Sequence, residues 1–383
     1  MRKVYYFDNN ATTQVDKRVL KEMEYFLKNN YANPSSIYKI AQEARGAIEK
    51  AREQVAKLLN AEPEEIIFTS GGTESNNTVI KGIALALKDK GKHIITTQIE
   101  HHAVLNPCKF LEIQGYDVTY LTVDGYGMID LKELKNSIRK DTILISIIFA
   151  NNEIGTIQNI EEIGKIARKY NIYFHTDAVQ AVGKIPIDVK RLNIDFLSLS
   201  GHKLYGPKGI GALYSKKGVK FISLLHGGEH EKHRRAGTEN VAGIVGLGKA
   251  CEIALNEMEK EAIKIKKLKE KLENFLRSYF KDIKINGHPS ETLYNTLNFS
   301  LPDVNSQDIL ILLDQYGFCA SAGSACSAGI PEPSHVLKAI KLPEKYLKGT
   351  IRISLGKFNT EKEINKFIEI FPDIIRKLKN DKS

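Results

Sequence analysis

Three short motifs of the 383-residue chain carry side chains that could do chemistry together. In "TSGGTES", Gly71 and Gly72 let the backbone approach a ligand closely, and Thr73 can cap the helix that follows and offer its hydroxyl group. Because the N–H groups that begin a helix attract an anion, this motif indicates a phosphate site. Taken alone, an ordinary helix cap explains it as well.

The other two motifs supply a carboxylate and an amine. Asp177 of "HTDAVQ" ends the strand-like segment "IYFHT", where a carboxylate costs desolvation free energy unless a cation pairs with it. Lys203 of "SLSGHKLYGPKGIG" lies just beyond another strand-like segment, flanked by Ser200, Gly201 and His202. Partial burial there lowers the proton affinity of the amine, as a nucleophile requires. The alternatives are a helix-capping aspartate and a solvated surface lysine.

The three motifs together favour one cofactor. A carboxylate for a cationic ring nitrogen, a lysine for a Schiff base and a helix N-terminus for phosphate are what pyridoxal 5'-phosphate requires. In open α/β sheets, ligands bind at the carboxyl ends of the strands, which is where all three motifs stand. The sequence therefore predicts a pyridoxal phosphate site.

A fourth motif, "SAGSACSAG" from Ser321 to Gly329, surrounds Cys326 with small residues. These residues suit a turn, but they also suit a loop that lets a reactive thiol move. The remaining cysteines are Cys108, Cys251 and Cys319, too few and too scattered for a disulfide framework. We expect Cys108 and Cys251 to be small buried residues of helices, and Cys326 to be the reactive one.

The motif "HGGEHEKH" holds His226, His230 and His233 at spacings that could ligate zinc on a helix. Its glycines favour a loop instead, and no cysteine is near. We therefore expect no resident metal.

The arrangement of segments predicts an α/β fold. From about residue 40 to 215, short apolar runs alternate with amphipathic helical patterns, which indicates a mostly parallel sheet covered on both faces. A helical stretch over 241–280 ends this alternation, and a shorter set of strands and helices follows. We expect a large cofactor-binding domain over 16–256. Residues 1–15 and 257–383 would form a smaller α+β domain that carries the Cys326 loop.

The assembled motifs resemble the cysteine desulfurases of the NifS/IscS type, a group of class V aminotransferases with the type I fold of pyridoxal phosphate enzymes. The similarity runs from "FDNNATT" to "IRISLGKFNTEKEI", and its most specific pieces are "SGHKLYGPKGIGALY", "NNEIGTIQ", "HTDAVQAVGKIPID" and "GSACSA". The resemblance implies conversion of L-cysteine to L-alanine. Sulfur would pass to Cys326 as a persulfide, for iron–sulfur cluster assembly or other thiolation pathways.

The resemblance also implies a role for each residue around the cofactor. Lys203 would hold the cofactor covalently and then shuttle protons, and His101 would stack on the pyridine ring and assist proton transfer. Asp177 would keep the ring nitrogen protonated. Gln180 would touch the phenolic oxygen, and Asn152 would lie near that oxygen and the substrate carboxylate.

The phosphate and the substrate carboxylate have their own predicted partners. The resemblance implies phosphate binding by Gly72, Thr73, Ser200, His202 and, from a second subunit, Thr238. It implies that Arg352 of "TIRISLG" grips the carboxylate with its bidentate fork. A homodimer is expected because Thr238 would complete the partner's site.

Composition sets broader limits. The formal charge of +10 would suit a nucleic acid, but Lys and Arg are interleaved with Glu, as in "EKEAIKIKKLKEKLE", and such a pattern is typical of a solvated helix face. We therefore do not expect nucleic-acid binding.

The longest apolar run, "ILISIIFA", falls far short of the roughly 20 residues of a membrane helix, and the N-terminus has no signal-peptide core. These features predict a soluble, cytoplasmic protein.

Two other functions remain open at this point. Another reaction on the same cofactor, such as an aminotransferase reaction, would leave Cys326 idle. A non-catalytic sulfur-relay or RNA-associated scaffold would explain the basic charge, but it gives no reason to keep Lys203, Asp177 and Arg352 together. The sulfur acceptor, an iron–sulfur scaffold protein or another protein, is not specified by the sequence.

Overall fold

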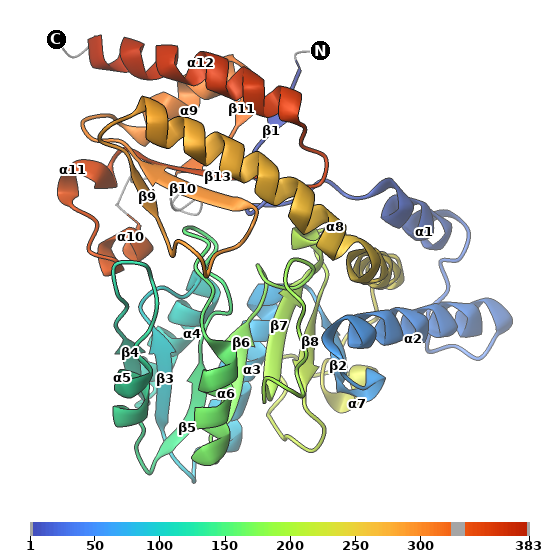
Figure 1. The fold of residues 1–383 in the computed structure, drawn as a ribbon. Coiled ribbons are helices and arrows are strands. Elements are labelled where there is room, and N and C mark those ends of the chain that lie inside the picture. The colour runs from blue at the N-terminus through green and yellow to red at the C-terminus, as the bar shows by residue number, and fades with distance from the viewer. Residues whose placement is uncertain (1–2, 323–333, 381–383) are drawn as a thin grey trace.

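A seven-stranded sheet forms the centre of the larger part of the molecule (Figure 1). The computed structural model describes residues 3–322 and 334–380. In spatial order the strands are β2 (Ile66–Thr69), β8 (Gly211–Ser215), β7 (Phe196–Ser200), β6 (Tyr173–Asp177), β5 (Thr142–Ser146), β3 (His93–Thr97) and β4 (Asp117–Leu121). Only β8 runs antiparallel to its neighbours in this sheet. The predicted mostly parallel sheet is confirmed.

Helices cover both faces of this sheet. One face packs against α3 (Gly72–Ala86) and α4 (His102–Ile113), and the other against α2 (Lys39–Leu59) and α6 (Ile160–Lys169). In Figure 1, α6 lies in front of the sheet and α3 behind it. Strands β3, β5, β7 and β8 are buried along their whole length, as expected for strands rich in Ile, Leu and Phe between two helical layers.

A second sheet forms the smaller part. It is antiparallel, in the order β12 (Ser321–Ala322), β13 (Thr350–Ser354), β10 (Thr296–Ser300) and β9 (Lys284–Asn286). Helices α9 (Ser306–Gln315) and α12 (Glu361–Asn380) pack on it around a separate hydrophobic core that contains Phe299, Phe367 and Phe371. The short helices α10 (His335–Ala339) and α11 (Glu344–Leu347) instead pack on the core of the larger part.

The helix α8 (Val241–Tyr279) joins the two parts, which confirms the predicted stretch over 241–280. Its first half contributes Leu247 to the larger core, and its second half contributes Leu268 to the smaller one. It packs closely on α2 at Gly248, where a Cβ atom would lie 2.6 Å from the Cβ of Ala51. A side chain at this position would therefore push the two helices apart.

The N-terminal segment runs beside the C-terminal part of the chain. Strand β1 (Tyr5–Tyr6) pairs in parallel with β11 (Phe318–Cys319), and Asp8 forms a bridge with Ser354 at the end of β13. Figure 1 shows both chain ends on the same side of the molecule. After β1 the chain crosses to α1 (Lys17–Lys28), so residues 7–16 lie between the two parts.

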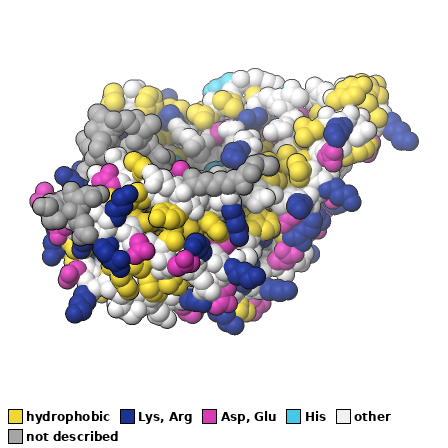
Figure 2. All heavy atoms as spheres, turned by 90° about the horizontal axis from the view of Figure 1, so that it is seen from above, with side chains coloured by type: hydrophobic (Ala, Val, Ile, Leu, Met, Phe, Trp, Pro, Cys, Tyr) yellow, Lys and Arg dark blue, Asp and Glu magenta, His cyan; other side chains and the backbone are white. Residues whose placement is uncertain are grey.

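The surface carries both signs of charge. On the face shown in Figure 2, Lys and Arg side chains are spread among Asp and Glu rather than gathered in one patch. This agrees with the interleaving of charges in the sequence. Among the described helices, none combines the length and the apolar character that crossing a membrane would need.

Candidate active site

A cavity of about 400 Å³ lies between the larger sheet, the N-terminal segment and β13. It is lined by residues that follow the carboxyl ends of parallel strands, together with Arg352 of β13. The predicted site residues that line it are Gly72, Thr73, His101, Asn152, Asp177, Gln180, Ser200, His202, Lys203 and Arg352. Residues far apart in the sequence thus meet at one site, as the strand-end rule predicts.

Lys203 ends a short 3-10 helix, η2 (Gly201–Lys203), that directly follows β7. Its Nζ atom donates hydrogen bonds to the backbone carbonyl oxygens of Asn10 and Ala11, the latter at 2.6 Å. The side chain is partly buried and points into the cavity. It is therefore not a solvated surface lysine, and its amine is held where a ligand can reach it.

Asp177 is the last residue of β6 and is only 4% exposed. Its Oδ2 atom accepts a hydrogen bond from Asn76 Nδ2 at 2.7 Å, and its Oδ1 atom accepts one from the backbone N–H of Val179. The Oδ1 atom of Asn76, also at the cavity, is buried and has no hydrogen-bond partner among the described residues. The carboxylate is thus fixed at the cavity wall.

Helix α3 begins at the cavity, but Thr73 does not cap it as predicted. The N-cap is Gly71, and Thr73 is the second residue of the helix. Glu74 reaches back instead, and its Oε2 atom accepts a hydrogen bond from the backbone N–H of Ser70. At Gly72, a Cβ atom would lie 2.5 Å from Cγ2 of Val179, so a side chain there would force Val179 to move. No side chain of the described residues caps the helix, so its first amides suit an anion in the cavity.

His101 is the N-cap of α4. Its Nδ1 atom accepts a hydrogen bond from the backbone N–H of Ala103 at 3.0 Å, so in the neutral ring the proton is on Nε2. Burial lowers the pKa of His101, and the positive charge of Lys203 lowers it further, against an opposing effect of Asp177. A neutral, flat ring is therefore presented to the cavity.

The residue before it, Glu100, is fully buried. Its Oε1 atom accepts hydrogen bonds from Thr97 Oγ1 and from the backbone N–H of Ile148, whereas Oε2 has no partner among the described residues. Burial raises the pKa of this carboxyl group to about 8. The folded protein therefore keeps Glu100 protonated at neutral pH.

This gives a testable pH dependence. The folded protein keeps a proton on Glu100 that the unfolded chain releases near its ordinary pKa of 4.5. The free energy of unfolding should therefore fall as pH rises from about 4.5 to about 8. Glu100→Gln cannot titrate at this position and should lose this fall in the free energy of unfolding. The stability of the variant relative to wild type should therefore rise between about pH 4.5 and about pH 8. Urea unfolding at several pH values measures it, with the exposed Glu22→Gln variant as control. Parallel stability curves for Glu100→Gln and wild type would contradict the expectation.

Gln180, Ser200 and His202 complete the floor of the cavity. Gln180 Nε2 donates to the backbone carbonyl of Asn10 at 2.9 Å. Ser200 stands close to the start of α3, since a Cβ atom at Gly71 would lie 3.5 Å from its hydroxyl oxygen. Burial lowers the pKa of His202 to about 4, with a further contribution from the charge of Lys203. His202 is therefore a neutral hydrogen-bonding group.

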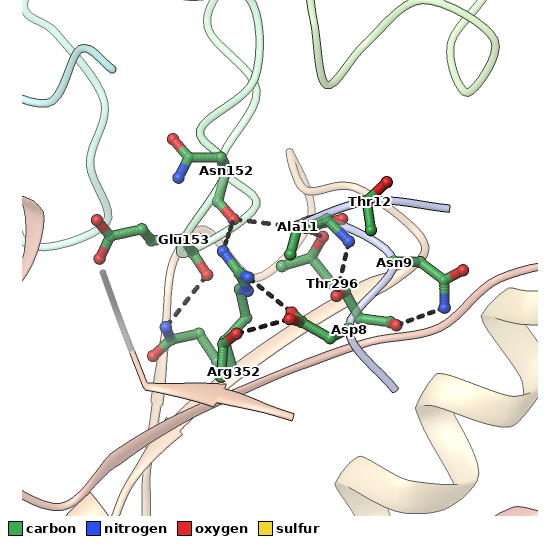
Figure 3. Close-up of polar contacts among 12 residues, drawn as sticks. Asp8, Asn9, Ala11, Thr12, Asn152, Glu153, Thr296 and Arg352 are labelled. Atoms are coloured by element: carbon green, nitrogen blue, oxygen red, sulfur yellow. Dashed lines mark hydrogen bonds and ion pairs between the residues drawn. The ribbon is translucent and has the colours of Figure 1, made fainter. Parts of the chain in front are cut away.

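Arg352 enters the cavity from β13 and is only 2% exposed. Figure 3 shows its guanidinium group between the backbone carbonyl of Asn152 and the carboxylate of Asp8. One terminal nitrogen donates to Asn152 O at 3.1 Å, and the other pairs with Asp8 Oδ1 at 2.7 Å. The second carboxylate oxygen of Asp8 accepts a hydrogen bond from Ser321 Oγ. Asp8 thereby fixes the position of the guanidinium group.

Two predicted residues do not meet this cavity. Thr238 is exposed and lines a separate hollow next to β2. Its loop follows α7 (His230–His233) and is anchored by a buried ion pair, in which Glu231 Oε2 lies 2.8 Å from a terminal nitrogen of Arg52. Cys326 lies in segment 323–333, outside the described residues.

The histidine motif of the same loop does not form a regular helix. Glu231, Lys232 and His233 have positive φ angles of 49°, 57° and 65°, a conformation that side chains rarely adopt and that breaks helical spacing. Within residues 3–322 and 334–380, no group of three or more His, Cys, Asp or Glu side chains is placed to hold a metal ion.

The cavity also contains residues that the motif analysis missed. They are Asn10, Ala11, Asn76, His102, Ala103, Ile148, Ala150, Glu153, Val179 and His335. Asn10 and Ala11 belong to "FDNNATT". The similarity of this motif to known enzymes could have identified them as site residues. His335 Nε2 donates a hydrogen bond to the backbone carbonyl oxygen of Glu100 at 2.9 Å. Its ring lies tilted against that of His102, with the ring centroids 4.9 Å apart, a contact that no sequence pattern indicated.

Comparison with known proteins gives a consistent result. Residues 5–367 match the family described as aminotransferase class-V. A relative from Methanosarcina thermophila, named cysteine desulfurase IscS, is 55% identical over 99% of this chain and 93% of its own. A solved structure of a NifS-like protein is 43% identical, with a TM-score of 0.93 over 99% of this chain and 100% of its own. Another, SspA in complex with cysteine, is 42% identical, with a TM-score of 0.82 over 93% and 99%.

Proposed function

Because the chain belongs to the aminotransferase class-V family and its relatives are cysteine desulfurases, we propose that it converts L-cysteine to L-alanine with pyridoxal phosphate and passes the sulfur to Cys326. The observation that carries the proposal is that the amine of Lys203, the carboxylate of Asp177 and the guanidinium group of Arg352 line one cavity. These are the groups that an amino-acid substrate and this cofactor need at one place.

The residues present fit pyridoxal phosphate. The first amides of α3, with Ser200 and His202 nearby, suit the phosphate group, and the neutral ring of His202 would bind it by hydrogen bonding rather than by charge. Asp177 would face the ring nitrogen, and His101 would stack on the ring. The cavity volume of about 400 Å³ suits a small cofactor with an amino acid.

The bound cofactor would supply an electron sink for a carbanion at the substrate Cα atom. Lys203 would move the proton at that atom, since its amine is already held in the cavity by the carbonyls of Asn10 and Ala11. Arg352 would bind the substrate carboxylate, and Asn152 lies beside it. Binding both ends of the substrate fixes the Cα–H bond relative to Lys203.

Sulfur transfer needs a nucleophile, and we assign this role to Cys326. Its thiolate would attack the substrate sulfur, the substrate C–S bond would break, and its electron pair would stay with the carbon part that leaves as alanine. The persulfide on Cys326 would then pass its outer sulfur to an acceptor, either an iron–sulfur scaffold protein or another thiolation protein. Transient contact of Cys326 with an iron–sulfur cluster belongs to the same proposal.

The proposal includes a homodimer in the cytoplasm. Thr238 is exposed and outside the cavity of its own chain, which supports a role at the phosphate of a second subunit. Cys108, Cys251 and Cys319 are free, which suits a reducing compartment.

Residues 16–256 would form the cofactor domain, and residues 1–15 with 257–383 the smaller domain. The two separate hydrophobic cores support this division, although α10 and α11 pack on the larger one.

Product analysis tests the function. Cofactor-loaded protein is incubated with L-cysteine and a reducing thiol, and alanine and sulfide are quantified for wild type and for Cys326→Ala. We expect equal amounts of both products from wild type, and loss of sulfide in the variant. The exposed control Lys208→Ala should behave as wild type. A reaction without alanine, or an unaffected Cys326→Ala variant, would instead favour another reaction on the same cofactor.

A further inference from the structure

A second lysine lies directly behind Gln180. The Nζ atom of Lys184 donates hydrogen bonds to both oxygens of Gln180, the backbone carbonyl and the side-chain Oε1, each at 3.1 Å. Lys184 does not line the cavity, whereas Gln180 does. Any effect of Lys184 on a bound group would therefore pass through Gln180 or through its charge.

These contacts fix the orientation of the Gln180 amide. On its other side, Nε2 donates to Asn10 O at 2.9 Å, and the same carbonyl oxygen accepts a hydrogen bond from Lys203. If the amide were reversed, its NH₂ group would face the amine of Lys184 and its oxygen would face the carbonyl of Asn10. Both contacts would then be repulsive, because each would pair two donors or two acceptors.

The hold on Gln180 does not depend on the charge of Lys184. Burial lowers the pKa of Lys184 to about 7, the charge of Lys203 lowers it further, and Glu261 of α8 acts in the opposite direction. His202 also lies within reach of its charge. A neutral amine keeps two N–H groups, one for each oxygen of Gln180. Its lone pair could also accept from a reversed amide, but the amide oxygen would then face the carbonyl oxygen of Asn10, so that contact still excludes the reversed orientation. The two hydrogen bonds therefore persist in both charge states.

We propose that Lys184 is a positioning residue that keeps the Nε2 group of Gln180 turned toward Asn10 and the cavity, so that Gln180 meets the phenolic oxygen of the cofactor only as a donor. The proposal rests on the proposed function, since it takes the cofactor and its contact with Gln180 from there. It makes a specific prediction about the bound cofactor, independent of turnover.

The test is a pH titration of the visible absorption of the loaded protein. Lys184→Met removes the donors while keeping side-chain length, and Lys190→Met is the matched control, because Lys190 is an exposed lysine paired with Glu62. A donor to the phenolic oxygen favours its deprotonated form. We therefore expect the midpoint to rise by about 0.7 pH units in Lys184→Met, the equivalent of one hydrogen bond, and to stay unchanged in Lys190→Met.

The Gln180→Ala variant separates positioning from charge. It should raise the midpoint in the same direction, and adding Lys184→Met to it should cause no further change, because the two residues act as one unit. A shift that persists in the Gln180→Ala background would assign the effect to the charge of Lys184 and overturn the proposal. An unchanged midpoint in Lys184→Met would overturn it as well.

Folding and function are checked separately. Melting temperatures measured without cofactor show whether each variant is folded. If Lys184→Met does not fold, an unchanged midpoint in Gln180→Ala alone would still refute the proposal. Wild-type protein that takes up the cofactor but forms no alanine from L-cysteine would refute the proposed function, while the comparison of midpoints would stay valid.

Discussion

Lys203→Ala is expected to lower the rate of alanine formation from L-cysteine by more than about a thousandfold, because no other described residue brings an amine to the cavity lining to move the proton at Cα. The same variant should lose the visible absorption that the proposed covalent link between this lysine and the cofactor would produce. Both effects are measured on purified protein supplied with pyridoxal phosphate.

Lys208→Ala is the control for this prediction. Lys208 lies five positions further along the same loop but is exposed, so its removal should leave both the rate and the spectrum unchanged. Melting curves establish that Lys203→Ala is folded, and the two lost hydrogen bonds to Asn10 and Ala11 should lower its stability only modestly. A Lys203→Ala variant that keeps the spectrum and forms alanine would remove this residue from the mechanism.

Arg352→Lys is expected to lower kcat/KM for L-cysteine by about a hundredfold, the equivalent of two charge-assisted hydrogen bonds at roughly 1.5 kcal/mol each. Most of the change should appear in KM, because the proposed role of the guanidinium group is to bind a carboxylate that does not react. Lysine keeps the charge that Asp8 needs but loses the planar fork. Steady-state rates of alanine formation measure the effect.

Cysteamine, which is L-cysteine without its carboxylate, gives the matched comparison. Its binding, followed by the change in visible absorption, should be nearly the same for Arg352→Lys and wild type. A variant that loses both ligands equally would show that Arg352 supports the fold of the site rather than the carboxylate. Its burial next to Asp8 makes that alternative worth measuring.

The elements were predictable where the sequence is strongly periodic. The short apolar runs that became β3, β5 and β7 are buried on both faces, and such strands produce continuous hydrophobic stretches with clear ends. The ends of these strands then located Asp177 and Lys203, because parallel strands bring their carboxyl ends to one edge. The helix over 241–280 was equally clear from its length.

Features of the site that depend on tertiary contacts could not be predicted from sequence patterns. The N-cap is Gly71 rather than Thr73, and no described side chain caps the helix. Several residues in "TSGGTES" could have taken the N-cap position. The contacts of Asp8 and Asn10 with residues more than 150 positions away follow from where the N-terminal segment crosses the molecule. Before the structure, only the resemblance to known enzymes marked that segment.

The central claim is that Cys326 carries the sulfur, and mass analysis tests it most directly. Loaded protein is mixed with L-cysteine without a reducing thiol, digested without reductant, and the peptide that contains Cys326 is weighed. We expect its mass to increase by one sulfur atom, with an equal amount of alanine released. Because the same peptide also contains Cys319, fragmentation of the peptide should place the added sulfur on Cys326, and Cys108, Cys251 and Cys319 should carry none. Alanine formed while the Cys326 peptide stays unmodified would contradict the account.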